Sequence, residues 1–266
     1  MPNTAERLLA AYDEQLRSDA EMRSAVRVER LGPLLLGTFR GGRGFVSYAP
    51  FAATGNGMLG DLVDAAVAHF SADPEVTEFE WKTRGHDELP GLEQLLTERG
   101  LVPEEPESVM VGEAAALAVD VPLPAGVSLQ QVTDRAGLEL MCTMQATVFG
   151  DPPESVGPRV EDHLREFAED TTGMEAWVAV ADGKVISAGR VNPVPGTNFA
   201  GIWGGSTLPE WRGKGIYRAL TAARARAALR AGKSLINSDS TEYSRPILER
   251  YGFAKVTTTT PYIWRR

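Results

Sequence analysis

Cysteine is almost absent from this chain, which has Cys142 alone among 266 residues. One thiol excludes a disulfide within the chain and a cysteine-rich zinc site. Histidine is nearly as scarce, and His69, His86 and His163 are far apart in the sequence. We therefore expect no metal site. Cys142 lies in the apolar stretch 138–144, which predicts a thiol buried in the core.

Long apolar runs and an excess of positive charge are also missing. No run of about 18 apolar residues occurs, and residues 1–23 lack the apolar segment of a signal peptide. The chain has 27 Lys and Arg against 36 Asp and Glu, a net charge of −9. Phosphate contacts dominate affinity for nucleic acids, so a chain this acidic is a poor nucleic-acid binder. These absences predict a cytoplasmic protein that binds neither membranes nor nucleic acids, as a monomer or a homodimer.

The length allows two domains of roughly 100–200 residues. Residues 114–126 read AAALAVDVPLPAG, in which small residues lead into two prolines and a glycine. This composition is typical of a linker. We therefore expect one domain over residues 1–115 and a second over residues 126–266.

The two halves share a pattern of elements. Glu98-Arg99-Gly100-Leu101 matches Arg250-Tyr251-Gly252-Phe253, each following a predicted helix, at an offset of 252 − 100 = 152 residues. Upstream, Pro50 and Pro209 each follow a predicted strand, at an offset of 209 − 50 = 159 residues. Similar elements in one order at similar offsets indicate a duplication.

The second half begins with consecutive strands and continues with helices. Asp182-Gly183 separates two apolar alternating segments, 176–181 and 185–192, and predicts a hairpin. Another strand is predicted over 199–207, followed by a helix over 216–231 and a further strand–helix–strand series. We therefore expect an α+β fold with a mixed, largely antiparallel sheet flanked by helices, present in two tandem copies.

The segment between that strand and that helix has the features of a diphosphate site. It reads Arg212-Gly213-Lys214-Gly215-Ile216-Tyr217. Glycines allow the backbone to approach a ligand closely, and the N-terminus of a helix presents unpaired N–H groups and a positive dipole end. Arg212 and Lys214 add charge. Gly204-Gly205, inside the preceding strand, predicts a bulge where a ligand could pair with the strand.

These residues resemble the coenzyme A signature of the GCN5-related N-acetyltransferase (GNAT) superfamily, Arg-x-x-Gly-x-(Gly/Ala) after a strand. The flanks 208–211 and 216–220 and the downstream segment 244–253 look like that family too. The resemblance covers about residues 127–264 and, in degenerate form, the first half. It implies the acyl-CoA N-acyltransferase fold and an enzyme that moves an acetyl group from acetyl-CoA to an amine.

The resemblance also implies roles for individual residues. The backbone of Gly205, Ser206 and Thr207 would pair with the pantetheine arm, and Asn237 and Ser240 would lie near the thioester. The backbone N–H groups of the loop would hold the diphosphate, from Arg212, Gly213, Lys214, Gly215, Ile216 and Tyr217. The amine acceptor, a small molecule or a peptide, would enter over residues 149–169.

The sequence departs from the family pattern at two positions. Tyr217 stands where Gly or Ala is usual, and it could pack outward or narrow the cofactor loop. Leu248 stands where many members carry a tyrosine that protonates the leaving thiolate. The strand over 202–207 has no carboxylate to act as a base. Tyr243 is the remaining candidate for the acid, and Glu242, Asp239 or an ordered water could serve as the base.

The departures keep a second function open, a non-catalytic acyl-CoA-binding module. The segment 149–170 is acidic, which favours a cationic acceptor. His163, within it, is expected to be a surface helix residue. In the first half, Gly55 to Gly60 spell a dinucleotide fingerprint, but five residues separate it from the preceding strand. It reads better as the counterpart of the Arg212 loop without its cations, so that half is expected to bind no coenzyme A.

Overall fold

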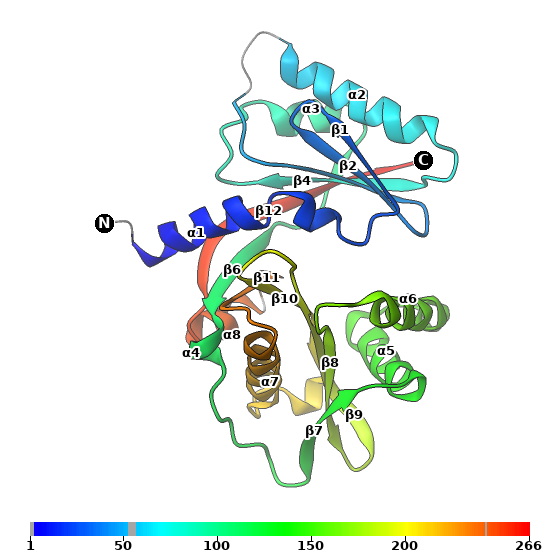
Figure 1. Cartoon of the computed structure of the whole chain (residues 1–266). Coiled ribbons are helices and arrows are strands. Elements are labelled where there is room, and N and C mark those ends of the chain that lie inside the picture. Colours follow the sequence, from blue (N-terminus) through cyan, green and yellow to red (C-terminus); the bar gives the residue numbers. More distant parts are fainter. Residues whose placement is uncertain (1–2, 53–56, 243) are drawn as a thin grey trace. The chain divides into compact units, whose positions relative to one another are not determined.

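The computed structural model describes residues 3–52, 57–242 and 244–266 (Figure 1). The chain divides into two compact units. Unit 1 comprises Met1–Met110, Asp239–Ile247 and Ala254–Arg266, and unit 2 comprises Val111–Ser238 and Leu248–Phe253. No helix among the described residues is long and apolar enough to cross a bilayer.

Unit 1 is built on a sheet with the strand order β1-β2-β3-β4-β12. Neighbouring strands are antiparallel except for β3 and β4, which are parallel and connected through α2. The elements are α1 (Thr4–Gln15), β1 (Arg27–Leu31), β2 (Leu34–Phe39), β3 (Arg43–Tyr48), α2 (Met58–Ala72), β4 (Glu78–Arg84), α3 (Leu92–Glu98), β5 (Val102–Pro103) and β12 (Ala254–Arg265).

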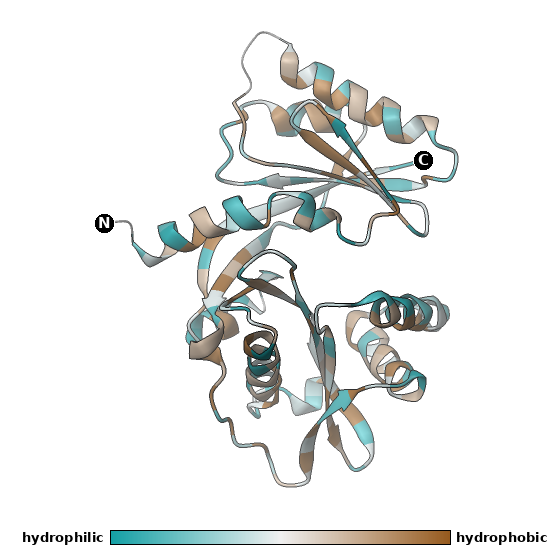
Figure 2. Ribbon diagram, viewed as in Figure 1, coloured by the Kyte–Doolittle hydropathy of each residue, from teal (hydrophilic) through white to brown (hydrophobic). Residues whose placement is uncertain are grey.

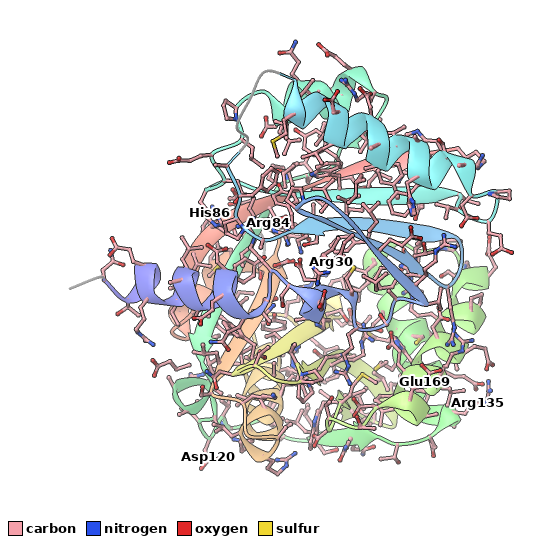
Figure 3. The ribbon with its side chains drawn as sticks, turned by 45° about the horizontal axis from the view of Figure 1, so that its top comes forward. Arg30, Arg84, His86, Asp120, Arg135 and Glu169 are labelled. Carbon is pink, nitrogen blue, oxygen red and sulfur yellow. The ribbon has the colours of Figure 1, made fainter. Side chains whose placement is uncertain are left out.

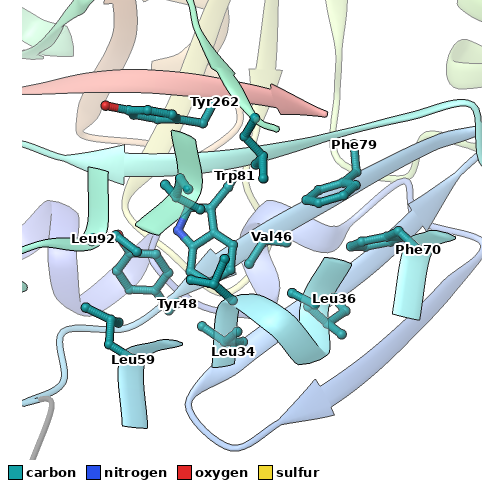
Figure 4. Packing of buried hydrophobic residues seen from close by; sticks show 14 of the residues in the cluster. Leu34, Leu36, Val46, Tyr48, Leu59, Phe70, Phe79, Trp81, Leu92 and Tyr262 are labelled. Atoms are coloured by element: carbon teal, nitrogen blue, oxygen red, sulfur yellow. The ribbon is translucent and has the colours of Figure 1, made fainter. Parts of the chain in front are cut away.

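Aromatic side chains fill the core of unit 1 (Figure 4). Phe70 from α2 stacks on Phe79 from β4 with ring centroids 4.7 Å apart, and Phe79 stacks in turn on Trp264 from β12 at 5.5 Å. Trp81 and Tyr48 are fully buried beside them. Burial of such large apolar surfaces holds α2 and β12 to the sheet.

The strands of unit 2 follow the order β11-β10-β9-β8-β7. Only β10 and β11 are parallel, and they are connected through α7. The elements are α4 (Ala114–Leu117), β7 (Val127–Val132), α5 (Arg135–Phe149), α6 (Val156–Glu169), β8 (Glu175–Ala181), β9 (Lys184–Pro193), β10 (Phe199–Thr207), α7 (Ile216–Arg230), β11 (Leu235–Ser240) and α8 (Arg245–Arg250). The last two residues of β11 and the first three of α8 belong to unit 1.

Helices cover both faces of the sheet in unit 2 (Figure 1). One apolar cluster joins α5 and α6 to β8 and β9, and another joins α7 to the opposite face. Figure 2 shows hydrophilic and hydrophobic residues alternating around α6, as expected for a helix with one face on a sheet. The predicted hairpin turn is present, with Asp182 and Gly183 both at positive φ between β8 and β9.

The predicted fold class is confirmed. Each unit has a mixed, largely antiparallel sheet flanked by helices, and each repeats one arrangement, in which two antiparallel strands precede a helix and a parallel strand. β3 ends at Tyr48 and β10 at Thr207, an offset of 207 − 48 = 159 residues. The offset found in the sequence therefore relates equivalent strands.

The units do not follow the expected division into residues 1–115 and 126–266. β12 lies in unit 1, antiparallel to β4 from Thr259–Arg84 to Arg265–Glu78. β6 (Glu107–Glu113) runs from unit 1 into unit 2, where its neighbour is β11. Pairing over such separations depends on complementary edges of distant strands, which a local composition change such as the linker does not reveal.

Candidate active site

The parallel strands β10 and β11 separate part-way along their length. They pair over three rows, of which the last joins Gly201 to Asn237. On its other side β10 remains paired with β9 as far as Thr207, with an irregular register between Trp203 and Ser206. The second half of β10 therefore has an edge that β11 does not cover, as required for pairing with an extended ligand.

Two side chains hold the irregular part of β10 in place. Gln145, buried on α5, donates from Nε2 to the carbonyl oxygen of Gly204 at 2.7 Å. Ser187 on β9 donates from Oγ to the carbonyl oxygen of Ser206 at 2.6 Å. Gly204 has φ of 62°, a conformation that disfavours other residues. The Gly204-Gly205 irregularity predicted from the sequence is therefore present and fixed by hydrogen bonds.

Beyond β10 the chain forms a loop whose glycines adopt left-handed conformations. Gly213 has φ of 73° and Gly215 has φ of 80°. Gly215 is the N-cap of α7 and has no side chain to cap the helix, so the first-turn N–H groups have no partner within it. Ile216 is buried in the core beneath the loop. The loop thus presents backbone N–H groups to an anion while the helix is anchored below.

The predicted cations flank this loop. Arg212 donates from Nε to the carbonyl oxygen of Thr207 at 3.0 Å, which draws its guanidinium to the end of β10. Lys214 is exposed, with Nζ 4.6 Å from the centroid of the Trp211 ring. Both charges stand beside the positive end of α7, so their fields add.

Tyr217 packs inward. A Cβ built on Gly205 would lie 2.9 Å from Cε2 and 3.2 Å from the hydroxyl oxygen of Tyr217. The ring therefore occupies the space that any side chain at position 205 would need. Of the two orientations that the sequence left open, the structure has the one directed toward the strand.

A buried arginine lies behind Tyr217. Arg224 on α7 is 1% exposed and lies 5.7 Å from the Tyr217 ring centroid. Its Nη2 donates to Thr221 Oγ1 at 3.1 Å, and its Nε donates to the carbonyl oxygen of Leu220 at 3.3 Å. Burial holds the pKa of Arg224 below its usual value, and the nearby Tyr217 only partly offsets this effect.

Sequence reasoning missed Arg224 and Gln145. Residues 217, 221 and 224 recur at helical spacing, so Tyr217, Thr221 and Arg224 share one face of α7. A charge on that face, among alanines that pack on a sheet, was a signal that could have been used. Gln145 gave no comparable signal, because a polar residue on a helix usually faces solvent.

Asn237, expected near the thioester, lies in β11 at the row where the strands separate. It is 6% exposed, and its Oδ1 has no hydrogen-bond partner among the described residues. Its neighbour Gly201 lies under the Trp203 indole, since a Cβ on Gly201 would be 2.5 Å from Nε1. The indole thus covers the point where β10 and β11 part.

The other predicted site residues belong to unit 1 or lie outside the described residues. Ser240 and Glu242 belong to unit 1, where Glu242 is exposed and pairs with Arg245 at 3.0 Å. Tyr243 lies outside the residues that the structure describes. Leu248 is fully buried in unit 2, so that position supplies no hydroxyl.

A polar cluster of His163, Glu166 and Arg190 lies on the expected acceptor side of unit 2, and the predicted position of His163 is wrong. His163 was expected on the surface, but it is 6% exposed, with Nδ1 3.1 Å from both Glu166 Oε2 and Arg190 Nη1. Arg190 also donates to Glu166 at 2.9 Å, which draws the imidazole toward the sheet. Cys142 is a buried core thiol as predicted, and burial raises its pKa.

The part of the chain that forms this geometry matches a known protein family. Residues 142–253 match the family model described as Acetyltransferase (GNAT) family, and this range contains β10, the loop and α7. This part of the chain, 112 of the 266 residues, belongs to the GNAT superfamily. The strand separation, the glycine-capped helix and the flanking cations all lie within the matched range. Among curated proteins, none matches the chain.

Solved structures similar to this protein share its fold over most of the chain. A GCN5-related N-acetyltransferase from Kribbella flavida has 17% identity and a TM-score of 0.71, covering 98% of this chain and 96% of its own. A tandem GNAT protein from the clavulanic acid biosynthesis pathway has 16% identity and a TM-score of 0.61, covering 100% and 97%. A GCN5-related N-acetyltransferase from Sphaerobacter thermophilus has 15% identity and a TM-score of 0.62, covering 88% and 76%.

The equivalent segment of unit 1 differs in its sequence. Gly57, at φ of 94°, is the N-cap of α2, and the residues preceding it at 53–56 lie outside the described part. No lysine or arginine occurs between Tyr48 and Lys82. The N-terminus of α2 therefore has no adjacent cation in the sequence.

Unit 1 instead concentrates its charges in a buried network around β4 (Figure 3 labels Arg84 and His86). Arg84 donates from Nη2 to both carboxylate oxygens of Glu21, at 2.6 and 2.8 Å. The Glu21 carboxylate also accepts a hydrogen bond from the Ser47 hydroxyl. Arg17 binds both carboxylate oxygens of Asp87, at 2.8 and 2.9 Å. The free-energy cost of burying such charges is offset only when each charge has its partner. The network therefore requires the packed form of unit 1.

Proposed function

We propose that unit 2 is an N-acetyltransferase that moves an acetyl group from acetyl-CoA to an amine. The observation that carries the proposal is the junction of β10 and α7. There an uncovered strand edge leads into a loop of left-handed glycines at a helix N-terminus. Strand pairing for an extended arm and N–H groups for a diphosphate are the two needs of coenzyme A.

The cofactor would lie along this junction. The first-turn N–H groups of α7, with Arg212 and Lys214, would hold the diphosphate. The pantetheine arm would pair with the backbone of β10 between Thr207 and Gly205, where the edge is uncovered. The Trp203 indole over Gly201 would close the far end. A short acyl group such as acetyl fits an end closed in this way.

The acceptor side favours a cationic substrate. Residues 149–170 contain seven Asp and Glu against two Arg. An excess of negative charge raises the local concentration of cations. A small-molecule or peptide amine would arrive there as an ammonium ion, lose a proton and attack the thioester carbonyl. Holding amine and thioester together supplies most of the rate enhancement in such a transfer.

The first experiment measures cofactor binding by titration calorimetry with acetyl-CoA. Replacing Arg212→Glu should weaken binding about tenfold or more, since a charge-assisted hydrogen bond contributes about 1.5–3 kcal/mol. Arg135→Glu is the matched control, because Arg135 is exposed on α5, on the opposite face of the sheet from α7. It should leave the affinity unchanged. Equal effects of both variants, or no heat with the unchanged protein, would reject the site.

The second candidate function, an acyl-CoA-binding module without catalysis, is favoured by Leu248, which is buried and supplies no acid. Incubation with acetyl-CoA and a panel of primary amines, with detection of the released thiol, separates the two. Turnover with any amine supports the transferase. Saturable binding with no thiol release across the panel supports the module.

We further infer that unit 1 is a degenerate copy of unit 2. It repeats the strand–helix–parallel strand arrangement, but no lysine or arginine occurs in the sequence between Tyr48 and Lys82. One acetyl-CoA per chain is therefore expected from the calorimetric stoichiometry. Two equivalent sites would contradict this inference.

A further inference from the structure

The departing thiolate of coenzyme A needs a proton or a compensating charge, and Leu248 provides neither. We propose that Tyr217 supplies this proton, with Arg224 as its positioning residue. The proposal rests on the cofactor site argued above. It assigns catalytic chemistry to a residue that breaks the glycine-rich loop pattern.

The position of the Tyr217 hydroxyl group suits it to this role. Tyr217 Oη would be 3.2 Å from a Cβ on Gly205, so it lies against the uncovered part of β10. A pantetheine arm that runs from the diphosphate loop past Thr207 brings its sulfur to Gly205. The hydroxyl is then within reach of the C–S bond that breaks. Tyr217 is partly exposed, so a ligand can meet it.

The positive charge of Arg224 lies behind the Tyr217 ring. Arg224 is fully buried, and no carboxylate among the described residues pairs with it. Its contacts are the Leu220 carbonyl, the Thr221 hydroxyl and the Tyr217 ring, whose centroid lies 5.7 Å from the guanidinium carbon. A positive charge this close to the ring stabilises negative charge on the Tyr217 oxygen after its proton has left. The uncompensated charge also favours negative charge developing on sulfur.

Tyr217 and Arg224 each occupy a space that a glycine leaves open. Gly205 has no side chain where the Tyr217 ring lies, and Gly189 on β9 has none where Arg224 lies, since a Cβ there would be 2.6 Å from Nη1. Two glycines on neighbouring strands thus make room for the pair. A tyrosine serving only as filler would require the first glycine but not a buried arginine without a carboxylate partner behind it.

The proposed acetyl transfer conserves atoms and charge. The amine nitrogen forms a bond to the acetyl carbon, and the C–S bond breaks with its electron pair going to sulfur. The sulfur takes the proton of Tyr217 Oη and leaves as coenzyme A thiol. The amide nitrogen releases its surplus proton to solvent, and solvent returns a proton to Tyr217.

The test uses Tyr217→Phe, which keeps the ring that fills the space at Gly205. With acetyl-CoA and a reactive primary amine from the panel, kcat should fall about 10²-fold, the size of a lost acid, while the KM for acetyl-CoA changes little. Arg224→Gln should lower kcat in the unchanged background but add little to Tyr217→Phe, because it acts through the tyrosine. Full kcat in Tyr217→Phe would overturn the proposal.

A second readout needs no acceptor. Coenzyme A carrying carbon-13 beside its sulfur reports ionisation of the bound thiol by its NMR shift as pH is raised. In Tyr217→Phe the bound thiol should require a pH about one unit higher, which is a tenfold change in its acid dissociation constant. Identical titrations in both proteins would leave Tyr217 as packing alone. Failure of the unchanged protein to bind coenzyme A would reject the proposed function itself.

Discussion

A missing side chain at Gly205 and a large one at Tyr217 form one feature of the molecule. The ring fills the space beside the glycine, so neither residue can change alone without a cost. The family pattern has a small residue at position 217, and the difference is accommodated on the facing strand rather than in the loop. This explains why the loop keeps its glycine conformations despite a bulky neighbour.

At the residue scale, Gly205→Ala should displace the Tyr217 ring, because the new Cβ would lie 2.9 Å from Cε2. We expect a loss of about 1–2 kcal/mol in the free energy of unfolding, as for other overpacked sites. Urea denaturation measures it. Gly157→Ala on α6 is the control, since a Cβ there meets nothing within 4 Å and alanine favours a helix. A loss in both variants would place the ring elsewhere.

At the scale of elements, two glutamates beside β4 are held in opposite ways. Burial favours a raised pKa for Glu21, but the charges of Arg84 and Lys82 and the hydrogen bonds of Ser47 and Arg84 lower it. Burial raises the pKa of Glu80, and the Arg84 and Lys82 charges do not offset it. Ionised Glu21 therefore stabilises unit 1, whereas ionised Glu80 destabilises it.

The resulting pH dependence has a definite sign. Because the folded pKa of Glu21 is below 4.5, its contribution is present above pH 4.5 and is lost as pH falls through the folded value. Glu21→Gln should cost about 3 kcal/mol at pH 7, the size of a broken buried pair, and the difference should shrink below pH 4.5. Thermal unfolding at pH 7 and pH 4 tests this.

Glu80→Gln is the matched variant with the opposite expectation. Its folded pKa is raised above 4.5, so removing the charge should stabilise the protein at pH 7 and have little effect below pH 4.5. The same unfolding experiment applies. If both substitutions lower the melting temperature at pH 7, the charge environment argued for β4 is incorrect.

Local features of this site were predictable from the sequence. The Asp182-Gly183 hairpin and the Gly213 and Gly215 loop depend on residues close in the chain, and both are present. The direction of the Tyr217 side chain was not predictable, because it depends on Gly205 in another element and on buried Arg224. His163 was missed for the same reason, since Arg190 on β9 draws it inward.

At the scale of the whole molecule, the two halves of the sequence are not the two units of the structure. β12 completes the sheet of unit 1 although it follows every element of unit 2. The pairing of Thr259 with Arg84 joins residues 259 − 84 = 175 positions apart. Local patterns predict that a strand exists but not which distant edge it joins.

This arrangement predicts where a core mutation in β12 is felt. Tyr262→Ala removes a side chain that is 5% exposed in the core of unit 1, at a cost of about 3 kcal/mol. Hydrogen exchange should accelerate in β4 and remain slow in β8. Val178→Ala in the core of unit 2 should give the reverse pattern. Faster exchange in β8 with Tyr262→Ala would contradict the division.

The place of β12 also bears on synthesis. A ribosome that has just finished β4 must add about 254 − 84 = 170 residues before the first residue of β12 exists. At about 5–20 residues per second this takes on the order of ten to thirty seconds. During that interval one edge of β4 has no partner, while most of unit 2 is already translated. The half made first is thus the half finished last, and the nascent polypeptide carries an open β-edge that a chaperone could shield.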